Sequence, residues 1–271
     1  MDLGLGGKFA LVVGAGADVG RAAAVSLGRE GARVILVGRK PQTLAETAGL
    51  VEAAGGQAHV LAADARDAAD VTRVVAEAVA VGGRIDLMVN TVGPYPLPED
   101  YPDVPEPMYG NDASWAKIFD NVFMPAVRFS REVIPRMKAQ GAGAVVHLAA
   151  NSARYYNPTT AQYAAMKSAL VHATKNWARD AGKHGVRVNA VLPGWIKGAT
   201  MQQRLAEAAA QAGRPVAEIE RETVAAHDNL FWSPRMGRTD EYADAIVFLL
   251  SDRASYINGA LLPVDGGTPV W

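Results

Sequence analysis

Short runs of apolar residues alternate along this chain with longer segments in which apolar residues recur at helical spacing. The first run, Phe9–Val13, leads into a glycine-rich turn, and apolar residues then recur at helical spacing from Val19 to Leu27. Unbroken apolar strands of about five residues that alternate with helices are typical of a parallel sheet covered on both faces. We therefore predict an α/β fold with strands at residues 9–13, 33–37, 58–62, 85–89, 144–148, 186–192 and 261–264.

Helices are predicted between the strands, where the apolar spacing is helical and glycine or proline closes a segment. One helix ends near Ala54, another opens at Asp67, and the two longest span residues 112–138 and Ala161–Arg179. No internal repeat or linker divides the chain, so we predict a single domain over residues 1–271.

Two segments interrupt the alternation of strands and helices. Residues 93–110 contain six prolines and are predicted to form a loop. Residues 200–226 are rich in Ala, Gln and Glu and are broken at Gly213-Arg214-Pro215, which indicates two helices outside the sheet. Because long insertions in compact domains are often functional, we expect a small helical substrate lid over about residues 195–235.

Composition excludes several classes of function. The 271 residues include 27 basic and 28 acidic side chains, so charge gives no reason to expect nucleic acid or a membrane surface as partner. The chain has no cysteine, and its five histidines show no short ligand spacing, so we expect neither a disulfide nor a metal site. The start of the chain is not typical of a signal peptide, and we find no run of about 18 apolar residues. We therefore expect a cytoplasmic protein with a small-molecule partner.

The turn after the first strand is the first candidate for chemistry. Glycines at positions 14, 16 and 20 let a backbone approach a pyrophosphate, and the free N–H groups at a helix start bind the anion. Glycine-rich turns also occur between strands and helices without any ligand. Because this turn follows the first strand of an alternating chain, we interpret it as a dinucleotide site.

The end of the second strand indicates which dinucleotide is bound. An acidic residue there would accept hydrogen bonds from the adenosine ribose, whereas an arginine suits a 2′-phosphate. The sequence has Gly38, Arg39 and Lys40 at this position and no acid. Both cations could simply be solvated residues at a helix entry, but we predict NADP as the cofactor, with NAD as the alternative.

Tyr163 and Lys167 lie four residues apart in the predicted helix Ala161–Arg179 and therefore share one face. An ammonium group beside a phenol favours the phenolate and lowers a pKa that starts at about 10. A tyrosine tuned in this way can exchange a proton with an alcohol or a carbonyl near neutral pH. The spacing alone is common by chance, but downstream of a dinucleotide turn it indicates a catalytic pair.

With these residues in place, the chain resembles the short-chain dehydrogenase/reductase family over nearly its whole length. The motifs that carry the resemblance are Gly14-Ala-Gly-Ala-Asp-Val-Gly20, Asp64-Ala-Arg-Asp67, Asn90-Thr-Val-Gly93, Asn121, Tyr163-Ala-Ala-Met-Lys167, Arg187-Val-Asn-Ala-Val-Leu-Pro-Gly194 and Asp265-Gly-Gly267. The resemblance implies a Rossmann-type, doubly wound parallel sheet that transfers hydride between a nicotinamide and a carbonyl or alcohol. It also implies a homodimer or homotetramer.

The resemblance implies a role for each matching residue. Tyr163 is expected to be the general acid/base, and Lys167 is expected to hold the nicotinamide ribose and to lower the tyrosine pKa. Asp64 is expected at the adenine and Asn90 on the adenosine side. The expected cofactor contacts are Gly14, Gly16, Asp18, Val19, Gly20, Arg39, Asp64, Ala65, Asn90, Gly93, Tyr163, Lys167, Pro193, Gly194 and Ile196.

Asn121 lies within the predicted helix 112–138 and has a physical argument of its own. Pro125 follows four residues later and has no N–H, so the Asn121 carbonyl loses its helical partner. Such a carbonyl can bind a water, and in the family it is similarly used in a proton relay that leads to the lysine. The alternative is a plain kink, but we predict the relay.

Three features depart from the family pattern. Asp18 stands where the family has the middle glycine of the turn, and its carboxylate would repel a pyrophosphate unless it points away or caps the helix start. The loop after Gly93 is several residues longer than usual. Ala150 occupies the position, thirteen residues before Tyr163, at which the family has its catalytic serine.

Ser152 is our candidate for the missing hydroxyl. If the chain stays extended, side chains alternate, so Ser152 faces the same side as Ala150 and Asn151 faces away. The alternative is that Ser152 only satisfies the loop backbone. We predict Asn121, Ser152, Tyr163 and Lys167 as the catalytic set. Asn151, Tyr155 and Trp195 are predicted substrate contacts, although the two aromatic residues could equally serve packing.

The leading hypothesis is an NADP-preferring carbonyl reductase or alcohol dehydrogenase. A narrower alternative is a 3-oxoacyl thioester reductase, in which Lys197, Arg204 and Arg214 would meet a phosphopantetheine or coenzyme A. An alternative from another class is a nucleotide-binding protein without redox activity, which Ala150 and Asp18 suggest.

Overall fold

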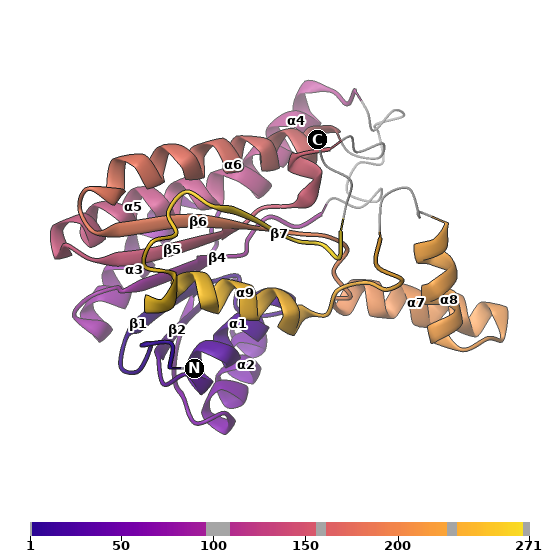
Figure 1. The fold of residues 1–271 in the computed structure, drawn as a ribbon, viewed down its shortest axis with the longest axis horizontal. Helices are drawn as coiled ribbons and strands as arrows, with labels where there is room; N and C mark the ends of the chain where they lie inside the picture. The colour runs from indigo at the N-terminus through magenta and orange to yellow at the C-terminus, as the bar shows by residue number, and fades with distance from the viewer. Residues whose placement is uncertain (1, 96–108, 156–160, 227–231, 268–271) are drawn as a thin grey trace.

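A seven-stranded sheet forms the centre of the computed structural model, which describes residues 2–95, 109–155, 161–226 and 232–267 (Figure 1). All strands are parallel, in the order β3-β2-β1-β4-β5-β6-β7. The strands are β1 (Phe9–Val13), β2 (Arg33–Gly38), β3 (Gln57–Ala62), β4 (Leu87–Asn90), β5 (Gly143–Leu148), β6 (Val186–Pro193) and β7 (Leu261–Val264). The predicted bounds agree to within a residue, except that β4 begins two residues later than expected.

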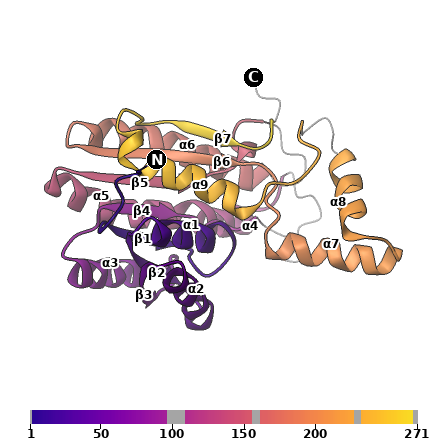
Figure 2. The same cartoon turned by 60° about the horizontal axis from the view of Figure 1, so that its bottom comes forward.

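Helices cover both faces of the sheet, as the predicted α/β architecture requires. The helices are α1 (Asp18–Arg29), α2 (Pro41–Ala53), α3 (Ala68–Gly82), α4 (Asp112–Ile118), α5 (Met124–Gln140), α6 (Ala161–Gly182), α7 (Ala199–Ala212), α8 (Val216–Ala225) and α9 (Thr239–Leu250). Helices α1, α2 and α9 pack on one face, and α3, α5 and α6 pack on the other (Figures 1 and 2). The doubly wound single-domain fold is therefore confirmed.

The central position of β1 in the sheet explains why its sequence is apolar at every position and does not alternate with polar residues. Ala10 and Val12 belong to the cluster that includes α1 and α9, whereas Leu11 and Val13 belong to the cluster that includes α3 and α5. A strand that is buried on both faces needs an apolar side chain at every position. All five residues of Phe9–Val13 are accordingly buried.

The helices differ from the predictions in two places. The expected helix over residues 112–138 is divided into α4, a π-helix at Phe119–Phe123 and α5. Helix α9 was not predicted, although Tyr242, Ile246 and Leu249 recur at helical spacing after an acidic first turn. The predicted helix start at Asp67 is confirmed, because its carboxylate accepts from two backbone N–H groups of the first turn of α3.

Helices α7 and α8 stand outside the layers, beyond the carboxyl end of β6, and we refer to them as the lid helices (Figures 1 and 2). They break at Gly213, as predicted, and share a small apolar cluster made by Leu205, Val224 and Met236. The predicted proline-rich loop lies mostly in residues 96–108, outside the described part of the chain. In the described part, no helix has the length and apolarity that a bilayer-spanning helix needs.

Candidate active site

The sheet places the candidate motifs at one edge. The strand order reverses direction between β1 and β4, and open parallel sheets bind ligands beside the carboxyl ends of the strands at such a point. The glycine turn follows β1, and the Asn90-Thr-Val-Gly93 motif begins at the end of β4. The two motifs touch, because the Thr91 hydroxyl donates to the carbonyl of Val13 at 3.0 Å and lies 3.4 Å from the carbonyl oxygen of Gly14.

The glycine turn has the tight geometry that a pyrophosphate cradle needs. Gly14 has a φ of 88°, which favours glycine, and an added Cβ would collide with the Thr91 hydroxyl. A Cβ on Gly20 would collide with the carbonyl of Gly14, so α1 begins directly against the turn. A Cβ on Gly16 would lie 2.6 Å from Thr43 Oγ1. Close neighbours therefore leave no room for a side chain at any of the three positions: threonine hydroxyls at Gly14 and Gly16, and the backbone of the turn at Gly20.

Asp18 does not cap α1, although it is the first residue of that helix. Its Oδ1 accepts a hydrogen bond of 2.7 Å from the backbone N–H of Ala199, the first residue of α7. Of the two arrangements expected to limit repulsion of a pyrophosphate, the structure therefore has the carboxylate turned away from α1. It caps a different helix.

The predicted adenosine end brings Arg39 and Asp64 to neighbouring positions after β2 and β3. Arg39 is exposed, and its charge is one of the influences that lower the pKa of Asp64. The main influence is Arg66, whose guanidinium grips the Asp64 carboxylate at 2.5 and 3.0 Å and holds its pKa at about 2. Arg66 belongs to the motif Asp64-Ala-Arg-Asp67, but its ion pair with Asp64 was not predicted. Its position two residues after Asp64 carried no periodic signal.

Asn90, which is expected on the adenosine side of the cofactor, lies at the end of β4, and Pro193, another expected cofactor contact, lies at the end of β6. Asn90 is buried, and its Oδ1 accepts from the backbone of Val92 at 3.1 Å, while its Nδ2 has no hydrogen-bond partner among the described residues. Pro193 ends β6, and the N–H of Gly194 donates to β7. Ile196 forms a bridge with Gly237. These contacts align the chain that leaves β6 toward the lid.

Tyr163 and Lys167 are both buried on α6 and lie close to each other, as their spacing predicts. The Lys167 ammonium is 5.5 Å from the centre of the Tyr163 ring and donates to the carbonyl of Leu148 at 2.9 Å. A Cβ on Gly93 would lie 2.9 Å from Lys167 Nζ and 3.2 Å from the carbonyl oxygen of Val122. The fold therefore brings α6, the loop after β4 and the π-helix together around one ammonium group.

The pKa values of this pair differ from the sequence-based expectation. Burial raises the pKa of Tyr163 above its ordinary value, and Tyr95 and Tyr155 raise it further. Burial also lowers the pKa of Lys167 to about 7. The expected lowering of the tyrosine pKa is absent, because desolvation of the buried phenol favours its neutral form. In this arrangement the phenol keeps its proton at neutral pH.

Asn121 lies inside the π-helix, one residue before Val122. The helix is widened there, since the N–H of Met124 donates to the carbonyl of Phe119 five residues earlier. A π-helix of this kind interrupts the α-helical ladder and is frequent at functional sites. The irregularity that Pro125 predicts is therefore present, and it lies beside Gly93 and Lys167.

The segment after β5 does not continue as a strand. Ala150 is extended and packs against Tyr163, which agrees with its place in the family's serine position. Asn151–Ala153 then form a turn of 3₁₀-helix, so the alternation on which the orientation of Ser152 was based does not apply. Ser152 is nevertheless buried, and among the described residues its hydroxyl has no hydrogen-bond partner.

Two further tyrosines influence Tyr163. Tyr95 meets Tyr163 edge-on, with ring centres 5.1 Å apart. Tyr155 is half-buried, and its hydroxyl lies 3.4 Å from Asn151 Oδ1. Tyr95 was missed by the sequence analysis, because its loop carries no helical or strand period.

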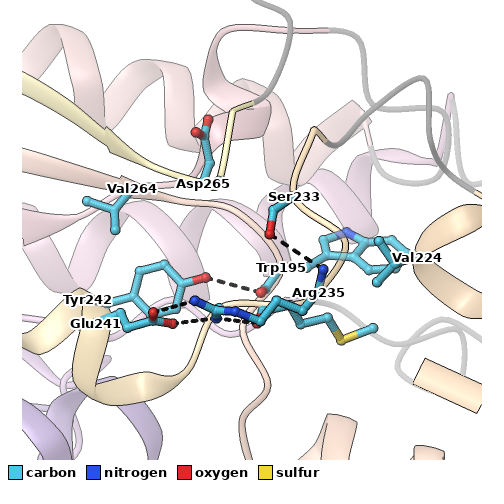
Figure 3. A pocket seen from close by; sticks show the side chains of 11 residues that line it. Trp195, Val224, Ser233, Arg235, Glu241, Tyr242, Val264 and Asp265 are labelled. Carbon is cyan, nitrogen blue, oxygen red and sulfur yellow. Dashed lines mark hydrogen bonds and ion pairs between the residues drawn. The ribbon is translucent and has the colours of Figure 1, made fainter. Parts of the chain in front are cut away.

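Trp195 has a different setting, beside a cavity of about 120 Å³ (Figure 3). Its ring packs on the cluster shared by the lid helices, and its carbonyl accepts from the hydroxyl of Tyr242 at 3.1 Å. Arg235 and Glu241 form a two-pronged ion pair at 2.7 and 2.8 Å across the same cavity. Much of the Trp195 ring is therefore engaged in packing against the lid helices.

The site defines a class of protein, and known proteins agree with it. A family model described as enoyl-(acyl carrier protein) reductase matches residues 14–269. The uncharacterized oxidoreductase YvrD of Bacillus subtilis (strain 168) is 35% identical over 271 residues, covering 98% of each protein. The chain therefore belongs to the short-chain dehydrogenase/reductase family and is an oxidoreductase.

Two further relatives have named activities. The 3-oxoacyl-(acyl-carrier-protein) reductase FabG of Thermotoga maritima is 30% identical over 263 residues, which are 97% of this chain and 98% of that protein. The structure of L-sorbose reductase from Gluconobacter frateurii, complexed with NADPH and L-sorbose, is similar with a TM-score of 0.87 at 30% identity. That similarity covers 99% of this chain and 98% of the other. The resemblance inferred from the motifs is confirmed.

Proposed function

We propose that this protein is an NADP(H)-preferring oxidoreductase that interconverts a carbonyl compound and a secondary alcohol. The observation that carries the proposal is the convergence of Tyr163, Lys167 and Gly93 at the sheet edge that also holds the glycine turn. NADPH supplies a hydride when bound, and the L-sorbose reductase that resembles this chain was solved with that cofactor.

The residues of the turn fit a dinucleotide. Gly14, Gly16 and Gly20 leave no room for side chains, so a diphosphate can approach the first N–H groups of α1. The buried Nδ2 of Asn90 has an unused donor on the same edge of the sheet. The remaining proposed contacts are Asp18, Val19, Arg39, Asp64, Ala65, Gly93, Tyr163, Lys167, Pro193, Gly194 and Ile196.

Arg39 carries the preference for the 2′-phosphate in this proposal. Its side chain is exposed, and no hydrogen bond or ion pair ties it to another described residue. Arg66 is not equivalent, because Asp64 already engages its guanidinium. A free guanidinium at the end of β2 can donate two parallel hydrogen bonds to the oxygens of a phosphate. An ammonium group does not have this planar, two-pronged geometry.

In the reductive direction, Tyr163 would donate its phenolic proton to the carbonyl oxygen of the substrate. Its raised pKa keeps that proton in place until the alkoxide develops. Lys167 holds the ribose hydroxyls, and the carbonyl of Asn121 holds a water that returns a proton through Lys167. Ser152 supplies a second donor to the substrate oxygen, in place of the hydroxyl that Ala150 lacks.

The substrate is a small molecule held between the catalytic residues and the lid helices. Asn151, Tyr155 and Trp195 are its proposed contacts, and the amide and the phenol favour a substrate with hydroxyl groups near the carbonyl. Similarity to an L-sorbose reductase supports the same class. We further propose a homo-oligomer, for which exposed Phe248 on α9 offers apolar surface; light scattering during gel filtration would measure it.

The alternative activity, reduction of a 3-oxoacyl thioester, is supported by the similarity to FabG. The basic residues near the lid helices support it less. Lys197 is paired with Glu220 at 2.5 Å, and Arg214 is paired with Glu218 and Glu222. Cations that are already paired attract a phosphopantetheine less strongly than free ones. The simple carbonyl substrate is therefore our first choice.

The test is oxidation of NADPH at 340 nm with hydroxy ketones, plain ketones and a 3-oxoacyl thioester. We expect turnover with at least one hydroxy ketone, and none in Tyr163→Phe, whose affinity for NADPH stays near that of the parent. Tyr256→Phe is the matched control, because that phenol is fully exposed. Turnover only with the thioester would select that alternative. Binding of NADPH without turnover of any substrate would favour the nucleotide-binding protein.

A further inference from the structure

Asp18 has an unusual backbone conformation. Its φ is 45°, and it is the only non-glycine residue with a positive φ in the part of the chain that the structure describes. An L-residue other than glycine adopts this region at a cost in free energy, and such strain persists where surrounding contacts impose it. The position is therefore one at which glycine would be the easier residue to fold.

The contact that offsets this strain joins two distant segments. Asp18 Oδ1 accepts from the N–H of Ala199 at 2.7 Å, across 181 residues of sequence. Ala199 is the first residue of α7, and the N-cap of α7 is Gly198, which has no side chain. A helix start needs an acceptor for its free N–H groups and favours negative charge. Asp18 supplies both to α7 from the glycine turn.

Gly198 is matched to Asp18. A Cβ at position 198 would lie 2.7 Å from Asp18 Oδ1 and 2.8 Å from its Cγ. The backbone at Gly198, with φ −81° and ψ −178°, is one that any residue adopts. Glycine is therefore required at 198 by the carboxylate of Asp18 and not by the backbone itself.

Helix α7 does not stand alone, so a contact at its start affects the whole lid. It packs against α8 through Leu205 and Val224, and Lys197, just before it, is paired with Glu220 of α8. We propose that Asp18 is a positioning residue that holds the lid helices against the cofactor turn and thereby lowers the KM for substrate. This proposal rests on the function proposed above, since it assumes a cofactor diphosphate at the turn and a substrate beneath the lid.

The same carboxylate has an opposite effect on the cofactor. A negative charge at the start of α1 repels a diphosphate bound there. Replacing Asp18 with glycine removes that charge, so the cofactor binds more tightly. The same change removes the cap of α7, so the lid is held less firmly. The Kd for the cofactor should therefore fall while the KM for substrate rises. A purely structural role for Asp18 would not shift these two constants in opposite directions.

Hydrogen exchange of unliganded protein tests the contact without any need for turnover. Loss of an N-cap acceptor in Asp18→Gly should speed exchange in the α7 peptide Ala199–Ala212 by about fivefold. Exchange in α3 (Ala68–Gly82), which is on the body of the fold, should not change. Asp18→Asn keeps an acceptor oxygen without the charge and should protect α7 nearly as well as the parent.

A second-site variant makes the test stricter. In the double variant Asp18→Gly, Gly198→Ser, the serine hydroxyl at the N-cap position can accept from the free N–H groups of α7. The Asp18 carboxylate, with which a Cβ at position 198 would collide, is absent. This double variant should regain the protection of α7, whereas Gly198→Ser alone should lose it. Unchanged exchange of α7 in Asp18→Gly, or a double variant no better protected than that variant, would overturn the proposal.

Kinetic constants complete the test. In Asp18→Gly we expect the KM for substrate to rise by about fivefold, while the Kd for NADPH falls. In Asp18→Asn the Kd should fall and the KM should stay near the parental value. A KM that is unchanged in Asp18→Gly would also overturn the proposal. If the parent turns over no substrate while α7 exchange still responds as stated, the proposed function fails and the contact between Asp18 and α7 stands.

Discussion

Lys167 offers a direct measurement of how strongly the fold desolvates the site. The residue is 1% exposed, and the carbonyl of Leu148 accepts from its ammonium group at 2.9 Å. Burial lowers the pKa of Lys167 from 10.5 to about 7. The perturbation that we consider is Lys167→Met, which keeps most of the length of the side chain and removes its titratable group.

The sign of the effect follows from proton binding. Between pH 7 and 10.5 the unfolded chain binds the Lys167 proton more fully than the folded protein does. The free energy of unfolding of the parent therefore rises with pH across this window, and it levels off below pH 7, where both states are protonated. With a pKa of about 7 in the folded state, Lys167 adds about 2 kcal/mol to the free energy of unfolding between pH 7 and pH 9.

The assay is urea unfolding of the parent and of Lys167→Met at pH 7, 8 and 9, followed by circular dichroism. Other groups titrate in this range, but they are the same in both proteins, so the difference between the two free energies isolates Lys167. We expect that difference to change by about 2 kcal/mol in favour of the parent as the pH rises from 7 to 9. A constant difference would mean that Lys167 stays charged in the folded protein, which would refute the desolvation argument.

The remaining predictions concern cofactor choice and the missing serine. The parent should bind NADPH more tightly than NADH, and Arg39→Asp should reverse this order with a change of about tenfold or more, because a carboxylate repels the 2′-phosphate; equal affinities of the parent in fluorescence titration would contradict this. Ser152→Ala should lower kcat/KM by about 10²-fold if its hydroxyl binds the substrate oxygen. Ala150→Ser should raise it, because the new hydroxyl would lie beside Tyr163. A collapse of activity in Asn151→Ala with no effect in Ser152→Ala would instead assign the donor role to Asn151.

Local features were readable from the sequence because each depends on residues close together in the chain. The apolar run Phe9–Val13 predicts a buried strand, and the structure has that strand with the same bounds. The carboxylate of Asp67 predicts a helix start that the structure confirms. Gly14 and Gly20 predict a tight turn, and both positions leave no space for a side chain. Pro125 predicts a disturbed helix, and a π-helix lies immediately before it.

Contacts between distant segments could not be read in this way. The orientation of Ser152 depends on whether the chain turns after Ala150, and a period of two gives the wrong backbone there. The pKa of Tyr163 depends on burial by several elements and on Tyr95, whose loop has no periodic pattern. The spacing of Tyr163 and Lys167 predicts that they are neighbours but not which group Lys167 donates to.

Asp18 shows the division most clearly. The sequence by itself shows an acid in place of a glycine and allows two arrangements that avoid a pyrophosphate. Only the tertiary structure determines that the carboxylate turns to α7, because that helix starts 181 residues later and is brought to the turn by the packed sheet. Backbone periodicity depends on residues that are close together in the sequence, so it can be predicted from the sequence alone. The hydrogen-bond partner of a polar side chain depends on the tertiary structure.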